Sequence, residues 1–221
     1  MRSRSLAPVG LFALARVFAA LAAMDIGTAF GSLGARREML VGFLAEPALL
    51  MVFFTASLLS QSTQLPVIVH ELAYRELAIY PSLAFAAVAF VMVLLAENAR
   101  IPIDNPTTHL ELTMIHEAMV LEYSARHLAL IEWSGALKLL NFAAIGLALF
   151  VPWGLGSPTQ DGASVLLALV LAVLKLGVVG AALALIETLS AKLRIFRAPE
   201  FLATAFLFAV LGLLVHLLLG A

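Results

Sequence analysis

Long apolar runs, each nearly free of charge, constrain this chain more than any other feature of its sequence. Each is close to the roughly twenty residues that a helix needs to cross the hydrocarbon core of a membrane. Hydrophobic residues make up 63% of the 221-residue chain and charged residues 12%, which is more apolar surface than a soluble domain can bury. The runs do not alternate as barrel strands do. The sequence therefore predicts an all-α, polytopic transmembrane protein.

We expect about six spans in one membrane domain, residues 1–221, without internal repeats. The spans cover residues 7–24, 40–60, 80–96, 128–151, 164–188 and 200–219. Polar stretches connect them: Asp25–Glu38, Gln61–Ile79, Glu97–His127, Pro152–Ala163 and Ser190–Pro199. The start, MRSRSLAP, leads into a membrane helix rather than a cleaved signal peptide. With an even number of spans, both termini lie on one side.

Positive charges in the connecting stretches orient the spans, because cytoplasmic loops carry an excess of Lys and Arg. One side receives Arg36, Arg37, Arg100, Arg126, Lys192, Arg194 and Arg197, and the other receives Arg2, Arg4 and Arg75. We therefore expect a multi-pass protein of the cell inner (plasma) membrane, with the Glu97–His127 segment in the cytoplasm.

Composition excludes several classes of function. The net charge of −1 gives no electrostatic reason to expect nucleic acid. The chain has no Cys, so it cannot supply thiolate ligands to an iron–sulfur cluster. We expect no cofactor and no metal in this chain.

Five charged residues lie inside or at the borders of the expected spans: Arg16, Glu46, Lys138, Lys175 and Glu187. An ionisable group at bilayer depth costs roughly 2.5–3.5 kcal/mol on insertion scales, so it needs a partner or a wet cavity. One interpretation is that these residues form structural pairs between helices or snorkel to the interface. The other, which we favour for Glu46, Lys138 and Lys175, is a polar path through the interior whose groups exchange protons.

The segment Glu97–His127 concentrates charge, with four Glu, one Asp, two Arg and three His. Pro102, Pro106 and the Asp104–Asn105 pair break any helix after Arg100. Thr107 or Thr108 can then cap a new helix.

In that amphipathic helix, Glu111 and Glu122 fall on one face, about 16 Å apart. His109, His116 and His127 fall on the opposite side. A solvated face at the membrane surface would also explain this pattern. The His spacings do not match the close pairs of zinc motifs, so contacts to a partner or to lipid headgroups explain them better than a metal site.

Two blocks of sequence carry a resemblance to a known family. The first has Glu97, Arg100, Pro102, Asp104 and Pro106, followed by Glu111-Leu112 and Glu122-Tyr123-Ser124. The second is Gly34-Ala35-Arg36-Arg37, with Glu46 twelve residues after the Gly. Together with the stretch AKLRIFRAPEFL, they resemble the membrane anchor subunit of energy-converting, complex I-related [NiFe] hydrogenases, of the formate hydrogenlyase subunit 4 type. That family is in turn similar to subunit 1 of respiratory complex I, the NADH–quinone oxidoreductase.

The resemblance implies a non-catalytic subunit that links redox chemistry in a docked hydrophilic module to proton or sodium translocation. It implies an ion path or coupling role for Glu46, Glu97, Asp104, Glu111, Glu122, Lys138, Lys175 and Glu187. It implies a docking junction formed by Arg36, Arg37, Arg100, Pro102, Pro106, His109 and His116. The implied partners are hydrogenase large and small, iron–sulfur subunits, which carry the NiFe and iron–sulfur centres, and antiporter-like membrane subunits.

Two departures from the family pattern affect this interpretation. Between Pro106 and the Glu-Tyr-Ser element the chain is three residues longer than the quinone-reducing branch, which favours the hydrogenase branch. Compared with the family's eight spans, the sequence begins at the third. Two alternatives stay open: a quinone-site membrane subunit of an NADH–quinone oxidoreductase-like complex, and a stand-alone secondary transporter. Transporters usually show inverted repeats, which ranks that alternative lowest.

Overall fold

The computed structural model describes residues 7–74, 81–101, 103–104, 114–154, 162–190 and 197–219. Within them, the regular elements are all helices. In chain order these are α1 (Ala7–Asp25), α2 (Ala29–Leu59), α3 (Leu65–Tyr74), α4 (Pro81–Glu97), α5 (His116–Val120), α6 (Ala125–Phe150), α7 (Gly162–Leu189) and α8 (Ala198–Leu219). The prediction of an all-α polytopic membrane protein is confirmed.

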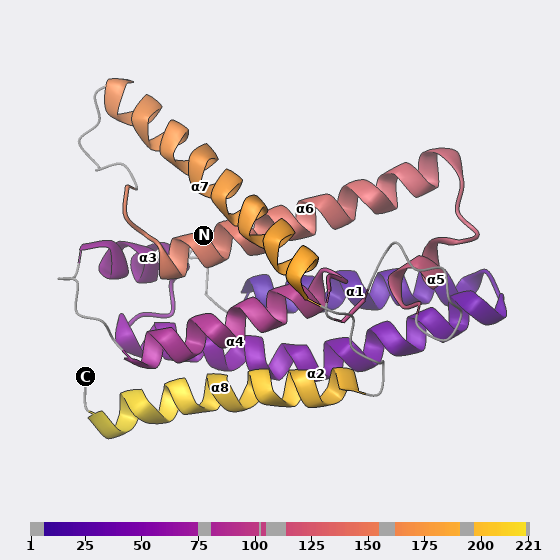
Figure 1. The fold of residues 1–221 in the computed structure, drawn as a ribbon, viewed down its shortest axis with the longest axis horizontal. Helices are drawn as coiled ribbons and strands as arrows, with labels where there is room; N and C mark the ends of the chain where they lie inside the picture. The colour runs from indigo at the N-terminus through magenta and orange to yellow at the C-terminus, as the bar shows by residue number, and fades with distance from the viewer. Residues whose placement is uncertain are drawn as a thin grey trace.

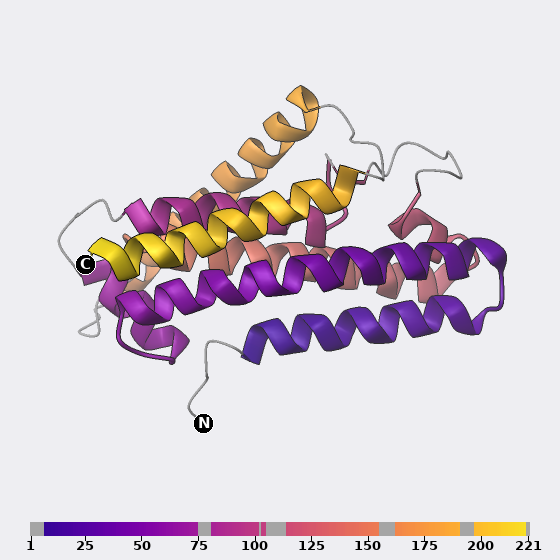
Figure 2. The same cartoon turned by 90° about the horizontal axis from the view of Figure 1, so that it is seen from below.

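Five of these helices, α1, α2, α6, α7 and α8, are long and apolar enough to cross a membrane. The remaining expected span, residues 80–96, corresponds to α4. This helix is apolar but only 17 residues long, at the lower limit for a spanning helix. Successive long helices run in alternating directions, so the turn between α1 and α2 and the short α5 lie at one end of the bundle (Figures 1 and 2). The start of α1 and the end of α8 lie toward the opposite end of the bundle (Figure 2).

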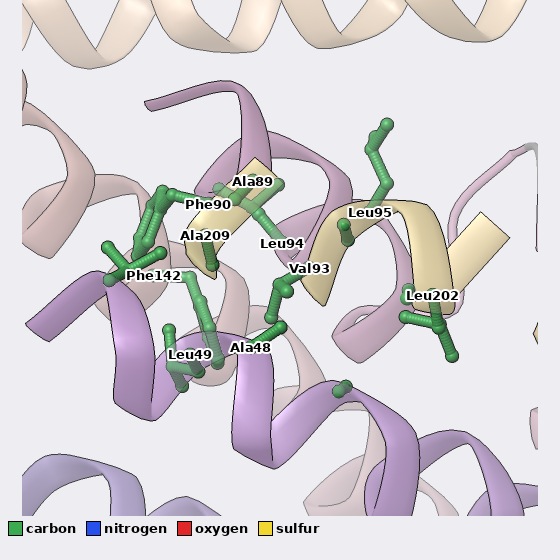
Figure 3. Close-up of a cluster of buried hydrophobic side chains, with 14 of the residues drawn as sticks. Ala48, Leu49, Ala89, Phe90, Val93, Leu94, Leu95, Phe142, Leu202 and Ala209 are labelled. Carbon is green, nitrogen blue, oxygen red and sulfur yellow. The ribbon is translucent and has the colours of Figure 1, made fainter. Parts of the chain in front are cut away.

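The core lies between α2, α4 and α8, which run side by side in both views (Figures 1 and 2). Small residues allow this close approach: Ala48, Ala89 and Ala205 are fully buried. A Cβ on Gly212 of α8 would lie 2.8 Å from the backbone oxygen of Ser82 on α4, so these two helices touch almost backbone to backbone. Larger apolar side chains fill the remaining space, among them Leu49, Phe90, Val93, Phe142 and Leu202 (Figure 3).

Helix α7 is packed quite differently from the core helices. None of its residues is buried, and it crosses α6 at an angle (Figure 1). Only Leu183 and Ile186, near its end, pack against the core, and both are partly buried. The exposed surface of α7 is apolar, as expected for a helix that is surrounded by lipid or by other subunits.

Two connecting stretches differ from the sequence-based expectation. Helix α2 begins at Ala29 rather than at residue 40, because the Thr28 hydroxyl accepts a hydrogen bond from the Gly31 backbone N–H at 3.2 Å and caps the helix. Gly27 adopts a positive φ of 75°, which closes the turn after α1. The second stretch, Gln61–Ile79, contains α3, which is too short to span.

The prediction of one continuous helix from Thr107 or Thr108 through Glu122 is wrong over its described part, residues 114–122, and its first residues lie outside the described part of the chain. Met114 and Ile115 are not helical, and the helical segment that follows, α5, has five residues and ends at Val120. The buried Asp104 carboxylate accepts a hydrogen bond from the His116 N–H at 3.1 Å, so a side chain from the preceding loop sets where α5 begins. Glu122 is exposed in the turn before α6.

Candidate functional site

Five charged side chains from four helices meet inside the bundle: Arg16, Glu38, Glu46, Glu97 and Lys138. We call them the charge cluster. Arg16 on α1 lies at the centre: its Nη1 is 3.2 Å from Oε1 of Glu46, and its Nη2 donates to Oε2 of Glu97. Its Nε is 3.4 Å from Oε1 of Glu38. One guanidinium thus faces three carboxylates.

Lys138 on α6 adds a second cation to the cluster. Its Nζ is 3.1 Å from Oε2 of Glu97 and donates to the Glu97 backbone oxygen at 2.5 Å. Glu97 at the end of α4 is therefore held by Arg16 and Lys138 together. Two cations against three carboxylates leave the cluster with a net negative charge when all five groups are ionised.

Burial differs sharply within the charge cluster. The Arg16 and Glu97 side chains are 3% and 2% exposed, whereas Glu46 is 36% exposed. Ions withdrawn from water are stable only when well paired, and removing one partner of such a pair is strongly destabilising. Glu46 is therefore the carboxylate of the cluster that is most accessible from outside the bundle.

The guanidinium fits because α2 has Gly42 where it passes Arg16. A Cβ at this position would collide with the guanidinium and lie 2.7 Å from Cδ and Cζ of Arg16. The Nε of Arg16 is buried and makes no hydrogen bond within the described residues. The guanidinium of Arg16 is therefore buried, but one of its three nitrogens lacks a hydrogen bond to the described residues.

A cavity of about 570 Å³ opens beside the charge cluster, within the size range of small-molecule sites. Arg16, Glu38, Glu97 and Lys138 form part of its wall, and Asn98, Arg100, Asp104, His116, Glu117 and Glu132 form the rest of its polar lining. Apolar side chains that include Phe12 and Ile131 line the same space. The cavity thus connects the cluster with the segment that follows α4.

The predicted docking junction is built around close contacts between α2 and α5. A Cβ on Gly34 would lie 2.7 Å from the Ile115 backbone oxygen, and Arg37 donates from Nη1 to the Met114 backbone oxygen at 2.7 Å. Asp104 is 2% exposed, so its carboxylate organises this region from within. Arg36, by contrast, points outward and is exposed.

The structure brings together three of the predicted coupling residues, Glu46, Glu97 and Lys138. It does not bring in Lys175, whose Nζ donates to the backbone oxygens of Val151 and Trp153. Glu187 instead lies 3.3 Å from Nη1 of Arg100, and both side chains are partly exposed. Several predicted positions lie outside the described residues: Pro102, Pro106, Thr107, Thr108, His109, Glu111, and the orienting charges Arg2, Arg4, Arg75, Lys192 and Arg194.

Sequence reasoning missed two members of the charge cluster as site residues. Glu38 falls in an expected connecting stretch, although it lies in the third turn of α2. Arg16 stands out as a charge within a span, but nothing in the sequence distinguishes a central residue from a peripheral pair. The helical spacing of Glu38, Gly42 and Glu46 at intervals of four, which puts all three on one face of α2, is the signal that could have found them.

The described residues do not form a metal site. Among them, no group of three or more His, Asp or Glu side chains is placed to hold a metal ion, and the chain has no Cys. The three carboxylates of the charge cluster share Arg16 instead.

Long apolar helices around a buried group of ionised side chains define a polytopic membrane protein with a charged interior. More specifically, the chain belongs to the NADH dehydrogenase family, whose profile matches residues 4–218.

Two curated relatives are similar over much of this chain. Formate hydrogenlyase subunit 4 of Escherichia coli (strain K12) is 33% identical over 202 residues, which cover 91% of this chain and 64% of the relative. Hydrogenase-4 component C of the same organism is 35% identical over 145 residues, 65% of this chain and 44% of the relative. The chain therefore spans less than two thirds of the length of both.

Proposed function

We propose that this protein is the membrane anchor and coupling subunit of a multi-subunit, formate hydrogenlyase-like hydrogenase complex. In this role it links redox chemistry in a docked hydrophilic module to proton or sodium translocation. The observation that carries the proposal is the charge cluster: Arg16, Glu38, Glu46 and Lys138 lie within helices long enough to span a membrane, and Glu97 ends the shorter apolar helix α4. The names of the two relatives, a formate hydrogenlyase subunit and a hydrogenase-4 component, support the choice of complex.

Ion movement is the chemistry that the charge cluster supports best. Ionisable residues within membrane spans are costly and mark ion or proton pathways when they line an interior cavity. Glu46 and Glu97 are the proton-exchanging members, and Lys138 holds Glu97. Asp104 lines the same cavity and extends the path toward the junction. Glu111 and Glu122 remain proposed members of the path on the family resemblance.

Coupling requires that a change in the redox module reach these carboxylates. A charge that appears near the cavity shifts their proton affinity, and one pKa unit corresponds to 1.36 kcal/mol. The path from the junction is short, because Asp104 fixes the start of α5 and lines the cavity that contains Glu97. A shift of α5 would therefore change the surroundings of the charge cluster directly.

The junction forms the docking surface for the hydrophilic module. Exposed Arg36 and partly exposed Arg100 present positive charge, which gives a partner register and orientation. The partners are hydrogenase large and small, iron–sulfur subunits, which carry the NiFe and iron–sulfur centres, and antiporter-like membrane subunits. The protein lies in the plasma membrane with the junction in the cytoplasm, and it holds no cofactor of its own.

A second candidate function is the quinone-site subunit of an NADH–quinone oxidoreductase-like complex. The cavity favours it, because its volume of about 570 Å³ and its mixed polar and apolar lining suit a small ring-shaped ligand. Genes for flavin- and NADH-binding subunits next to this one would support it, and a gene for a nickel-binding large subunit would favour the hydrogenase.

Co-purification tests the proposal most directly. The tagged chain is isolated from native membranes in mild detergent, and its partners are identified by mass spectrometry. We expect a nickel-containing large subunit together with iron–sulfur subunits. Flavin- and NADH-binding partners would support the quinone-site function instead, and isolation without redox partners would contradict both. The complex, reconstituted into vesicles, is then expected to move ions during turnover.

The junction is tested by the fraction of the large subunit that stays with washed membranes. Arg100→Ala and Asp104→Ala should both loosen the module. Asp104→Asn is the matched control, because its amide oxygen still accepts the hydrogen bond from the His116 N–H. Equal retention in all three variants would contradict a docking role for this region.

A further inference from the structure

Arg16 lies between two carboxylates that come from different helices and differ in exposure. Its Nη1 faces Glu46 on α2, and its Nη2 faces Glu97 on α4. Glu46 is 36% exposed and Glu97 2%. The same planar group therefore separates the outer carboxylate from the inner one.

The chemistry of the three groups is unequal. A carboxylate takes up and releases a proton, so a chain of carboxylates and water can pass protons along. A guanidinium stays protonated under all conditions in a protein, so it neither accepts a proton from Glu46 nor hands one to Glu97. Its positive charge also opposes the approach of another proton.

We propose that Arg16 is the gate of the proton path, a positioning residue that keeps Glu46 and Glu97 apart until it moves aside. The gate rests on the proposed function, because it presupposes protons that travel through the charge cluster. With Arg16 in place the path is interrupted between its outer and inner carboxylates. When the guanidinium leaves, the two carboxylates face each other across space that water can enter.

The structure offers the guanidinium somewhere to go. Arg16 borders the cavity of about 570 Å³, and three further acidic residues, Asp104, Glu117 and Glu132, line the same space. Its Nε makes no hydrogen bond within the described part of the chain, so Arg16 is held mainly through its two terminal nitrogens. Gly42, on the opposite side, leaves no side chain in the way of its return.

Lys138 leaves the buried Glu97 carboxylate with a cationic partner when Arg16 moves away. When Arg16 leaves, Glu97 keeps the ammonium of Lys138 at 3.1 Å, whereas Glu38 and Glu46 both lose their ion-pair partner in the cluster. Glu46 is 36% exposed and Glu38 11%, so Glu46 is the carboxylate of this pair that water reaches more easily. Arg16 thus faces Glu38 and Glu46 of α2, Glu97 of α4 and Lys138 of α6, and these charges together set its position.

A passive leak measurement tests the gate without turnover. The whole complex is reconstituted into vesicles with a pH-sensitive dye inside, and the decay of an imposed pH gradient is followed. We expect Arg16→Gln to speed this decay several-fold over the wild type. The double variant Arg16→Gln/Glu46→Gln should return to the wild-type rate, because the outer carboxylate that feeds the path is gone. Arg126→Gln, which neutralises an exposed arginine at the start of α6, should leave the decay unchanged.

The outcomes of the leak measurement separate a gate from a packing defect. A general loss of packing would make the single and double Arg16 variants leak alike, and that result would overturn the gate. So would a wild-type rate in Arg16→Gln. If Arg16→Gln does not assemble, Gly42→Ala displaces the same guanidinium and is expected to leak, again only while Glu46 is present. Failure of the proposed function has a different signature: the wild-type complex would move neither protons nor sodium ions during turnover. Sodium movement without proton movement would keep the proposed function and overturn the gate.

Discussion

Lys138 and Lys175 lie at similar depths in long apolar helices, yet they have opposite surroundings. Lys138 contacts Glu97 within the charge cluster and borders its cavity. Lys175 extends back to the end of α6, where it donates to the backbone oxygens of Val151 and Trp153. One lysine belongs to a network of ionised side chains, and the other binds carbonyl groups just beyond the end of a helix.

The helices that carry the two lysines explain the difference. Helix α6 packs against the core helix α4, with Phe142 buried next to Phe90, and this contact turns Lys138 toward the cluster. Helix α7 has no buried residue; it crosses α6 at an angle (Figure 1) and reaches the core only near its end, with Leu183 and Ile186. A charge within a span therefore joins a charged network only where its helix packs against others that carry complementary charges.

Glu97 should be the residue whose loss affects the chain most. Glu97→Ala leaves Arg16, 3% exposed, without its most buried partner, and breaking a buried pair from one side costs about 3–5 kcal/mol. We expect a lower yield of folded chain in membranes and a lower midpoint temperature of unfolding in detergent. Glu132→Ala, an exposed acid on the cavity wall, is the control and should unfold like the wild type. Similar losses for both would show that the charge cluster does not stabilise the fold.

Glu46→Gln should affect ion movement far more than stability. The amide keeps the size and hydrogen bonding of the side chain but cannot release a proton. Because Glu46 is 36% exposed, we expect a change in unfolding free energy of about 1 kcal/mol or less. The ratio of ions moved to electrons transferred in vesicles should fall while hydrogen evolution continues. Normal pumping by this variant would make Glu46 a structural partner of Arg16.

The sequence predicted the membrane helices well, because the hydrophobic content of a span is a local property. It failed at residues 29–38, where the charges of Arg36, Arg37 and Glu38 suggested a connecting stretch. There the cap at Thr28 and the partners that these side chains find on α1 and near α5 allow the helix to continue. Local charge did not reveal that the partners existed.

The site could be predicted only in part, for the same reason. Glu46 and Lys138 were recognisable as charges within spans, and Glu97 was recognisable through the family resemblance, but their meeting depends on how α2, α4 and α6 pack. The mean hydropathy of α7 is 2.6 and that of α8 is 2.5, yet α8 has residues buried in the core, whereas α7 only touches the core with the partly buried Leu183 and Ile186. Such differences arise from contacts between distant segments, which a single sequence does not display.

Gly42→Ala should have an intermediate effect. The new Cβ would lie 2.7 Å from Cδ and Cζ of Arg16, so either the helices separate or the guanidinium moves. Overpacking of this kind costs about 1–3 kcal/mol. Gly10→Ala on α1 is the matched control, because nothing lies within 4 Å of its added Cβ. We expect a lower unfolding midpoint for the Gly42 variant alone, and equal midpoints would mean that Arg16 adjusts freely.

Lys175→Met should have the smallest effect of the series. The substitution removes hydrogen bonds to the Val151 and Trp153 carbonyls, and bonds from a charged donor contribute about 1.5–3 kcal/mol each. It also removes a charge whose placement at bilayer depth costs about 2.5–3.5 kcal/mol. The two bonds together contribute about 3–6 kcal/mol, a range that overlaps the cost of the charge and opposes it, so we expect a small net loss of stability and an unchanged ratio of ions to electrons. The same vesicle assay as for Glu46→Gln checks this. A loss of ion movement as large as that of Glu46→Gln would place Lys175 on the path after all, and the contrast between the two lysines would then describe only how the helices pack within this chain.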